Sequence, residues 1–165
     1  MDFVDGLVEK CHIGYIVEDV DTSLAQLQKQ LNCAIGAQTY LFAPAKAWTD
    51  DAPVQDVVLK MVICKIKDNM TFEYIQPLTQ NGYHYQALKQ GGEGLNHVCF
   101  ATEDFDGYRK EFRQMGAAFL FEAEANDPKN GYRRCFYAQL PGIPGVFEIL
   151  ENAKPYRENL QERSR

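Results

Sequence analysis

The chain carries one short sequence pattern twice. The stretch CHIGYIVEDVDTSLAQL near the N-terminus is echoed by NHVCFATEDFDGYRKEF in the middle of the chain. His12 corresponds to His97 and Asp21 corresponds to Asp106, and both pairs are separated by 85 positions. A chain that repeats a histidine-bearing unit at constant spacing is expected to fold as two similar modules.

Both copies predict a strand that runs into a helix. Residues 11–17 and 96–102 are apolar on both alternating faces, which is typical of strands that are covered on both sides. Asp21 and Asp106 follow these strands and are the predicted N-caps of the two helices. The first helix is expected to end near Asn32. Three strand-like segments come after each helix. We therefore predict an α+β fold with two tandem βαβββ modules.

The pattern also predicts how the chain is divided. The first module spans residues 9–80 and the second spans residues 95–152, with a connector at 81–94 that contains a short helix. Residues 153–165 form a polar tail. The stretch at 40–53, YLFAPAKAWTDDAP, is a long and turn-rich insertion in the first module.

Composition excludes several kinds of partner. The net charge of −6 argues against nucleic acid, because phosphate contacts need a basic face. The sequence has no run of about 18 apolar residues that could span a membrane, and its start does not read as a signal peptide. The five cysteines are odd in number and form no C-x-x-C pair, so we expect reduced thiols in a cytoplasmic protein. These cysteines are Cys11, Cys33, Cys64, Cys99 and Cys135.

Each half also places a glutamate after a phenylalanine in its last strand. Glu73 lies in TFEYIQP and Glu148 lies in VFEILEN. A glutamate in an apolar strand is rarely buried unless it is paired or bound to a cation. If the modules are related by a pseudo-two-fold axis, both glutamates and the repeated His12 and His97 can converge on one point. Two imidazoles and two carboxylates suit a divalent transition metal and leave two coordination positions open.

A simpler interpretation of these residues stays open. A histidine on a strand is often a satisfied core residue, and a strand glutamate can face solvent at a sheet edge. His84 has no counterpart in the repeat and is expected at the surface or at the rim of a ligand pocket, whereas Cys99 is expected to be a core thiol. Two pairs of charged residues are expected at the solvated surface: Arg133 with Arg134, and Asp50 with Asp51.

From about residue 9 to residue 152 the sequence resembles the vicinal oxygen chelate superfamily. This superfamily includes glyoxalase I, bleomycin-resistance proteins, extradiol dioxygenases and methylmalonyl-CoA epimerase. The resemblance implies that the two modules form a cupped mixed sheet and that the protein is a homodimer. It also implies one divalent ion, such as Zn, Co, Ni or Mn, bound by His12, Glu73, His97 and Glu148.

The stretches GEGLNH and RRCFYAQLPGIPGVFEILE are most similar to the methylmalonyl-CoA epimerase branch. That likeness implies an isomerase that removes a proton next to a carbonyl, with an acyl-CoA as its small-molecule substrate. Glu148 is the first candidate base, and Asp56 is the nearest carboxylate for an opposing second base. An alternative is a lactoylglutathione lyase like glyoxalase I, in which Glu73 and Glu148 would move the proton. A binding protein that sequesters drugs is the alternative from another class.

Overall fold

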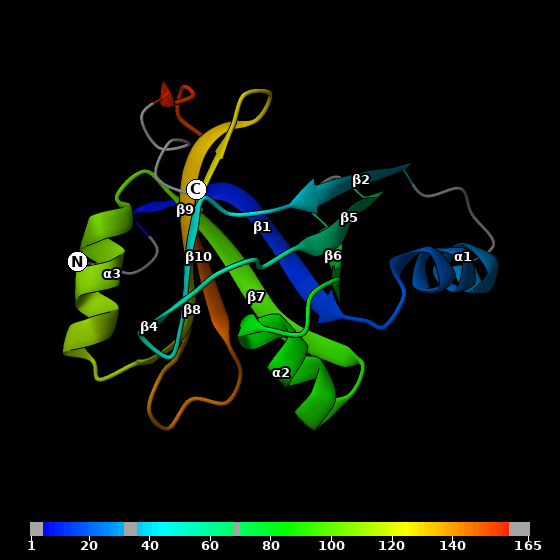
Figure 1. Cartoon of the computed structure of the whole chain (residues 1–165), viewed down its shortest axis with the longest axis horizontal. Helices are drawn as coiled ribbons and strands as arrows, with labels where there is room; N and C mark the ends of the chain where they lie inside the picture. Colours follow the sequence, from blue (N-terminus) through cyan, green and yellow to red (C-terminus); the bar gives the residue numbers. More distant parts are fainter. Residues whose placement is uncertain (1–4, 32–35, 68–69, 159–165) are drawn as a thin grey trace.

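Strands that are far apart in the sequence lie side by side in one curled sheet (Figure 1). The computed structural model describes residues 5–31, 36–67 and 70–158. The strands in this part of the chain are β1 (Leu7–Ile16), β2 (Gly36–Phe42), β3 (Lys46–Thr49), β4 (Ala52–Val54), β5 (Leu59–Lys67), β6 (Met70–Pro77), β7 (Gly94–Thr102), β8 (Ala118–Asp127), β9 (Gly131–Gln139) and β10 (Phe147–Glu151). The helices are α1 (Val20–Leu31), α2 (Gly82–Gly91) and α3 (Phe105–Gln114).

The strand order mirrors the sequence repeat. The ten strands lie in the order β2-β5-β6-β1-β7-β10-β9-β8-β3-β4. β1 runs parallel to β6, β7 runs parallel to β10, and β1 pairs antiparallel with β7 where the two halves meet. The predicted α+β fold with a cupped mixed sheet is therefore confirmed. The predicted module ranges, 9–80 and 95–152, stay predictions.

The helix caps lie two residues before the predicted positions. The side chains of Asp19 and Asp104 each accept a hydrogen bond from the backbone N–H three residues further on, at 2.7 Å and 3.0 Å. Asp21 and Asp106, the predicted caps, lie in the first turns of α1 and α3. The correct caps are again 85 positions apart, so the repeat extends to them. The predicted helix end at Asn32 lies outside the described residues.

The long insertion forms two strands that the sequence did not predict. β3 and β4 make a hairpin whose two turn residues, Asp50 and Asp51, have positive φ angles of 49° and 63°. A two-residue hairpin with both φ angles positive is a favoured connection for which aspartate is well suited. β3 pairs with β8, so a segment of the first half extends the sheet beyond the second half. Both aspartates are exposed as expected, and Asp51 forms an ion pair with Arg113.

Alternation of side chains along the strands separates one apolar cluster on the concave side of the sheet from two on the outer side. On β9, Cys135 and Tyr137 face the concave side of the sheet, while Phe136 faces the outer side under α3. On β5, Met61 faces the concave side and Val62 packs toward α1. This is the two-residue period of a strand. Figure 1 shows α1 and α3 at opposite ends of the molecule, with α2 between them.

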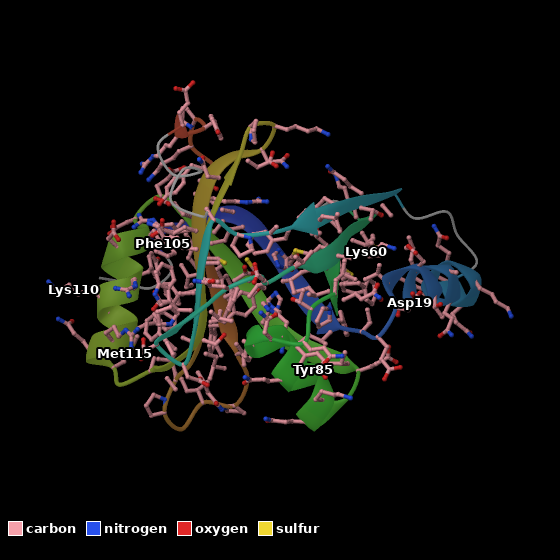
Figure 2. All side chains as sticks on the ribbon, viewed as in Figure 1. Asp19, Lys60, Tyr85, Phe105, Lys110 and Met115 are labelled. Carbon is pink, nitrogen blue, oxygen red and sulfur yellow. The ribbon has the colours of Figure 1, made fainter. Side chains whose placement is uncertain are left out.

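α3 shows how an amphipathic helix divides its side chains. Phe105, Tyr108 and Phe112 are buried against the outer face of the sheet. Lys110 lies on the same helix at the outer margin of the molecule and is exposed (Figure 2). Burial of three aromatic rings at helical spacing explains why this segment is a helix despite its many charges.

Three cysteines are placed by the structure. Cys64, Cys99 and Cys135 are buried and free, as expected for reduced thiols. The side chains of Cys11 and Cys33 lie outside the described residues. Among the helices that the structure describes, none has the length and apolarity that a membrane span requires.

Arg134 anchors the outer face of the second half. Its guanidinium makes two hydrogen bonds to Glu151, both at 2.9 Å, and two to the exposed Asp106, at 2.8 Å and 3.0 Å. It also lies 4.4 Å from the centre of the Phe105 ring. Burial raises the pKa of Glu151, but Arg134 and Lys154 outweigh that effect and lower it overall.

We predict that Glu151→Gln lowers the free energy of unfolding at pH 7 by about 1.5–3 kcal/mol, because a buried charge-assisted pair is lost. The lowered pKa of Glu151 means that this stability is present above the ordinary glutamate pKa of about 4.3 and is lost as the pH falls below it. Urea titrations between pH 3 and pH 7 measure both effects. Asp106→Asn is the matched control and should cost less than about 1 kcal/mol, because its carboxylate is exposed.

If Glu151→Gln and Asp106→Asn lowered the free energy of unfolding equally, this account of the ion pair would be contradicted. The same holds if the free energy of unfolding of Glu151→Gln depended on pH as that of the wild type does.

Candidate metal centre

Four side chains from the four central strands converge on the concave face. They are His12 on β1, Glu73 on β6, His97 on β7 and Glu148 on β10, and their nearest ligand atoms all lie within 4.8 Å of one another. The Nε2 atoms of the two histidines are 3.2 Å apart. Glu148 Oε2 lies 3.1 Å from His12 Nε2 and 3.2 Å from His97 Nε2. The structure therefore brings together all four residues that the sequence analysis proposed as metal ligands.

The chemistry of this cluster fits a divalent cation. Glu73 Oε2 and Glu148 Oε2 are fully buried, and neither has a hydrogen-bond partner among the described residues. Buried carboxylate oxygens without a partner are costly, and a bound cation would satisfy both. Two carboxylates also balance the charge of a divalent ion, and imidazole nitrogens are suitable ligands for Zn²⁺ and similar metals.

Two of the four groups, Glu148 and His12, have pKa values shifted by their neighbours in the cluster. Burial raises the pKa of Glu148, but contacts from His12 and His97 outweigh this and hold it well below its usual range. Burial lowers the pKa of His12, but the charge of Glu73 and further contacts from Cys99 and Glu148 raise it overall. Strong mutual perturbation of buried groups is typical of functional sites.

Surrounding side chains orient the cluster. Asn96 Oδ1 lies 3.0 Å from His97 Nδ1, and Asn96 Nδ2 donates to the Tyr83 hydroxyl at 2.9 Å. Because Asn96 Oδ1 can only accept, His97 Nδ1 carries the proton and Nε2 keeps its lone pair for a metal. The Tyr40 hydroxyl donates to Glu73 Oε1 at 3.2 Å. None of these three supporting residues was singled out from the sequence.

Gly14 leaves room for one of the histidines. It is directly opposite His97 in the β1–β7 register, and a Cβ atom there would overlap the imidazole ring. Any side chain at this position would displace His97 from the cluster. A glycine inside a strand is a recognised signal for such a close approach. Gly14 in HIGY is therefore a sequence signal for the packing of His97 that was missed.

Three residues of the cluster, His12, Glu73 and Glu148, line a cavity whose other walls are largely apolar. Phe42, Leu59 and Met61 line it on one side, and Phe121 and Ala123 line it on the other.

Arg133 also lines the cavity, and it forms no ion pair with any residue that the structure describes. Its neighbour Arg134 is paired on the outer face of the sheet. The expectation of a solvated arginine pair is therefore wrong, because successive strand residues face opposite sides.

Three other predicted positions have definite places. Asp56 is exposed in the loop between β4 and β5, and it is not among the residues that line the cavity. The structure does not bring it to the cluster, and its role as second base stays a prediction. His84 was expected at the surface or rim, but it is 1% exposed and forms part of the cavity wall. Cys99 is a buried thiol as expected, at 1% exposure, and its pKa is raised mainly by burial.

A sequence-family model agrees with this arrangement. The model that describes the glyoxalase/bleomycin resistance protein/dioxygenase superfamily matches residues 11–136. The chain belongs to this superfamily. The matched range contains three of the four cluster residues, and Glu148 follows it on β10. No curated protein matches the chain by sequence.

Several solved structures share the fold of this chain. A methylmalonyl-CoA epimerase variant from Streptomyces coelicolor, in complex with 2-nitronate-propionyl-CoA, superposes with a TM-score of 0.57 at 18% identity, covering 90% of this chain and 99% of that one. The epimerase from Mycobacterium tuberculosis gives 0.55 at 17% identity, covering 90% and 89%. A mutant 4-hydroxymandelate synthase from Streptomyces coelicolor gives 0.56 at 14% identity, covering 96% and 52%.

We predict that the purified protein binds about one divalent ion per chain. His12→Ala and His97→Ala should each lower the metal content strongly, because each removes one of four ligands. Elemental analysis after dialysis against a panel of Zn, Co, Ni and Mn salts measures this. The third described histidine supplies the control, since His84→Phe should leave the metal content unchanged. Full metal retention in the double variant His12→Ala/His97→Ala would refute the site.

Proposed function

We propose that the protein is a metal-dependent isomerase or epimerase that removes a proton next to a carbonyl group. An acyl-CoA thioester such as methylmalonyl-CoA is the favoured substrate. The observation that carries the proposal is the group of four ligands, in which Glu73 Oε2 and Glu148 Oε2 are buried without a hydrogen-bond partner among the described residues. A sequestering protein would have no need for such a group. A homodimer in the cytoplasm remains our expectation.

The proposed chemistry divides between the cation and the carboxylates. A divalent ion at the cluster would supply Lewis-acid polarisation of a substrate that offers it two oxygens, and this makes the carbon-bound proton more acidic. Glu148 is the proposed base, because its carboxylate lines the cavity beside the position that the cation would take. Glu73 is the second carboxylate in the cavity, and the hydroxyl of Tyr40 fixes one of its oxygens. We therefore propose Glu73 as a second proton-transfer group, and the role of Asp56 stays a prediction.

The cavity wall supports an anionic acyl substrate. Arg133 is a charged donor without an ion-pair partner among the described residues, and it lies close enough to Tyr40 and Cys135 to influence their pKa values electrostatically. A guanidinium is well suited to bind a carboxylate or phosphate. The apolar side chains of Phe42, Leu59 and Met61 would accommodate the hydrocarbon part of the acyl group.

We predict that the metal-loaded protein catalyses deuterium exchange from heavy water into methylmalonyl-CoA. Glu148→Gln should keep part of its metal, because the amide still offers an oxygen, and should lose at least about 100-fold in rate because the base is gone. Mass spectrometry of the recovered thioester measures the exchange. Metal analysis of the same samples separates loss of the base from loss of the ion.

Absence of exchange over a panel of acyl-CoA thioesters would contradict the epimerase proposal. Turnover of the hemithioacetal formed by methylglyoxal and glutathione would then identify a lyase like glyoxalase I.

We also predict that Arg133→Met raises the KM for an anionic acyl thioester about 10–100-fold, because a charge-assisted contact is worth about 1.5–3 kcal/mol. Arg133→Lys should retain part of the affinity, and kcat should change less than KM. Lys129→Met is the matched control, since Lys129 is an exposed cation in the turn before β9. Steady-state kinetics at two salt concentrations measure the difference. Equal KM values for Arg133→Met and the wild type would show that Arg133 does not contact the substrate.

A further inference from the structure

His84 is a buried polar side chain whose role the four-residue cluster does not explain. It lies in α2, is 1% exposed and lines the same cavity as His12, Glu73 and Glu148. Neither of its ring nitrogens has a hydrogen-bond partner among the described residues. A buried imidazole with two unpaired nitrogens is costly, so a partner from outside the chain is expected.

The ring of His84 is held rigidly beside the cluster. Its centroid lies 4.8 Å from that of Phe121 and 5.1 Å from that of Tyr137, and both contacts are edge-to-face. Tyr137 makes a second edge-to-face contact, at 4.7 Å, with His97. The two imidazoles therefore pack against the same aromatic ring, which places His84 next to the ligand cluster with a fixed orientation.

A second set of contacts ties α2 to the same place. Tyr83 precedes His84, and its hydroxyl accepts the hydrogen bond from Asn96, the residue that orients His97. The rings of Tyr83 and Tyr137 also lie 5.8 Å apart. Tyr83 thus ties α2 to Asn96 and Tyr137, and the ring of His84 cannot turn toward solvent without losing its own contacts with Phe121 and Tyr137.

The environment keeps this imidazole uncharged. Burial and the neighbouring His97 lower the pKa of His84 to about 3, and Glu148 opposes them only in part. A neutral imidazole carries one N–H donor and one acceptor nitrogen. It does not attract a carboxylate as strongly as a cation would, but its N–H can stabilise negative charge that develops on an oxygen.

We propose that His84 is a ligand-binding residue whose N–H donates a hydrogen bond to a planar oxyanion, of the enolate type, bound in the cavity beside the four-residue cluster. The inference rests on the metal centre of the proposed function and does not depend on the acyl-CoA substrate. It gives α2 a role in recognition, and it accounts for a donor placed in an otherwise apolar part of the wall.

The test uses acetohydroxamate, whose planar anion presents two adjacent oxygens as an enediolate does. The cobalt-loaded protein is titrated with acetohydroxamate, and binding is followed by the visible spectrum of the cobalt ion. We expect His84→Phe to bind the probe about 10–100-fold more weakly at unchanged cobalt content. His84→Gln should regain part of the affinity, because its amide again offers an N–H donor.

A second measurement needs no variant. In the zinc-loaded wild type with 15N-labelled histidine, acetohydroxamate should shift the ring N–H signal of His84 downfield as the hydrogen bond forms. An unshifted signal, equal affinities in His84→Phe and the wild type, or no binding to the cobalt-loaded wild type would each overturn the inference. A His84-dependent affinity together with no deuterium exchange into any thioester would leave the binding role intact and refute only the proposed reaction.

Discussion

The antiparallel pairing of β1 with β7 is the contact on which the rest of the site depends. In this register Gly14 is opposite His97 and His12 is opposite Cys99, so both histidines face the concave side. The parallel neighbours complete the group, because Glu73 is level with Gly14 and Glu148 is level with Cys99. A shift of one residue in either strand would turn its histidine to the outer face. The register of the strands therefore determines whether the cluster can form.

This arrangement buries two carboxylates that the fold alone does not satisfy. Burying charges is costly unless they are paired, and the imidazoles compensate for this only in part while no cation is bound. The free energy that offsets the cost comes from elsewhere in the molecule. On the outer face, α3 covers a cluster of aromatic rings and α1 covers a second apolar cluster. These two helices stabilise the sheet from outside, while the four ligand side chains lie among the apolar residues of the concave face.

The sequence was informative where a residue occurs in both copies of the repeat. His12 and His97 could be predicted because they share one spacing with their flanking residues. The caps were misplaced because each copy offers two aspartates, two positions apart, and only the backbone decides which one precedes the helix. Arg133 and Arg134 are the same residue type at successive positions. Only the register of β9 decides which of them faces the cavity and which faces the outer side. Pairing of β3 with β8 joins segments about 75 positions apart in the chain, and no local pattern reports such a contact.

The features that distinguish this cavity are not repeated between the two halves. The cluster itself is symmetric, with one histidine and one glutamate from each half. The α2 residue His84 and the β9 residue Arg133 both line the cavity, and neither belongs to a pair of repeated residues. A symmetric group of ligands can bind an ion but cannot distinguish the two ends of a substrate. Orientation must therefore come from the asymmetric wall, where an uncharged donor on α2 and a cation on β9 offer different partners to a bound molecule.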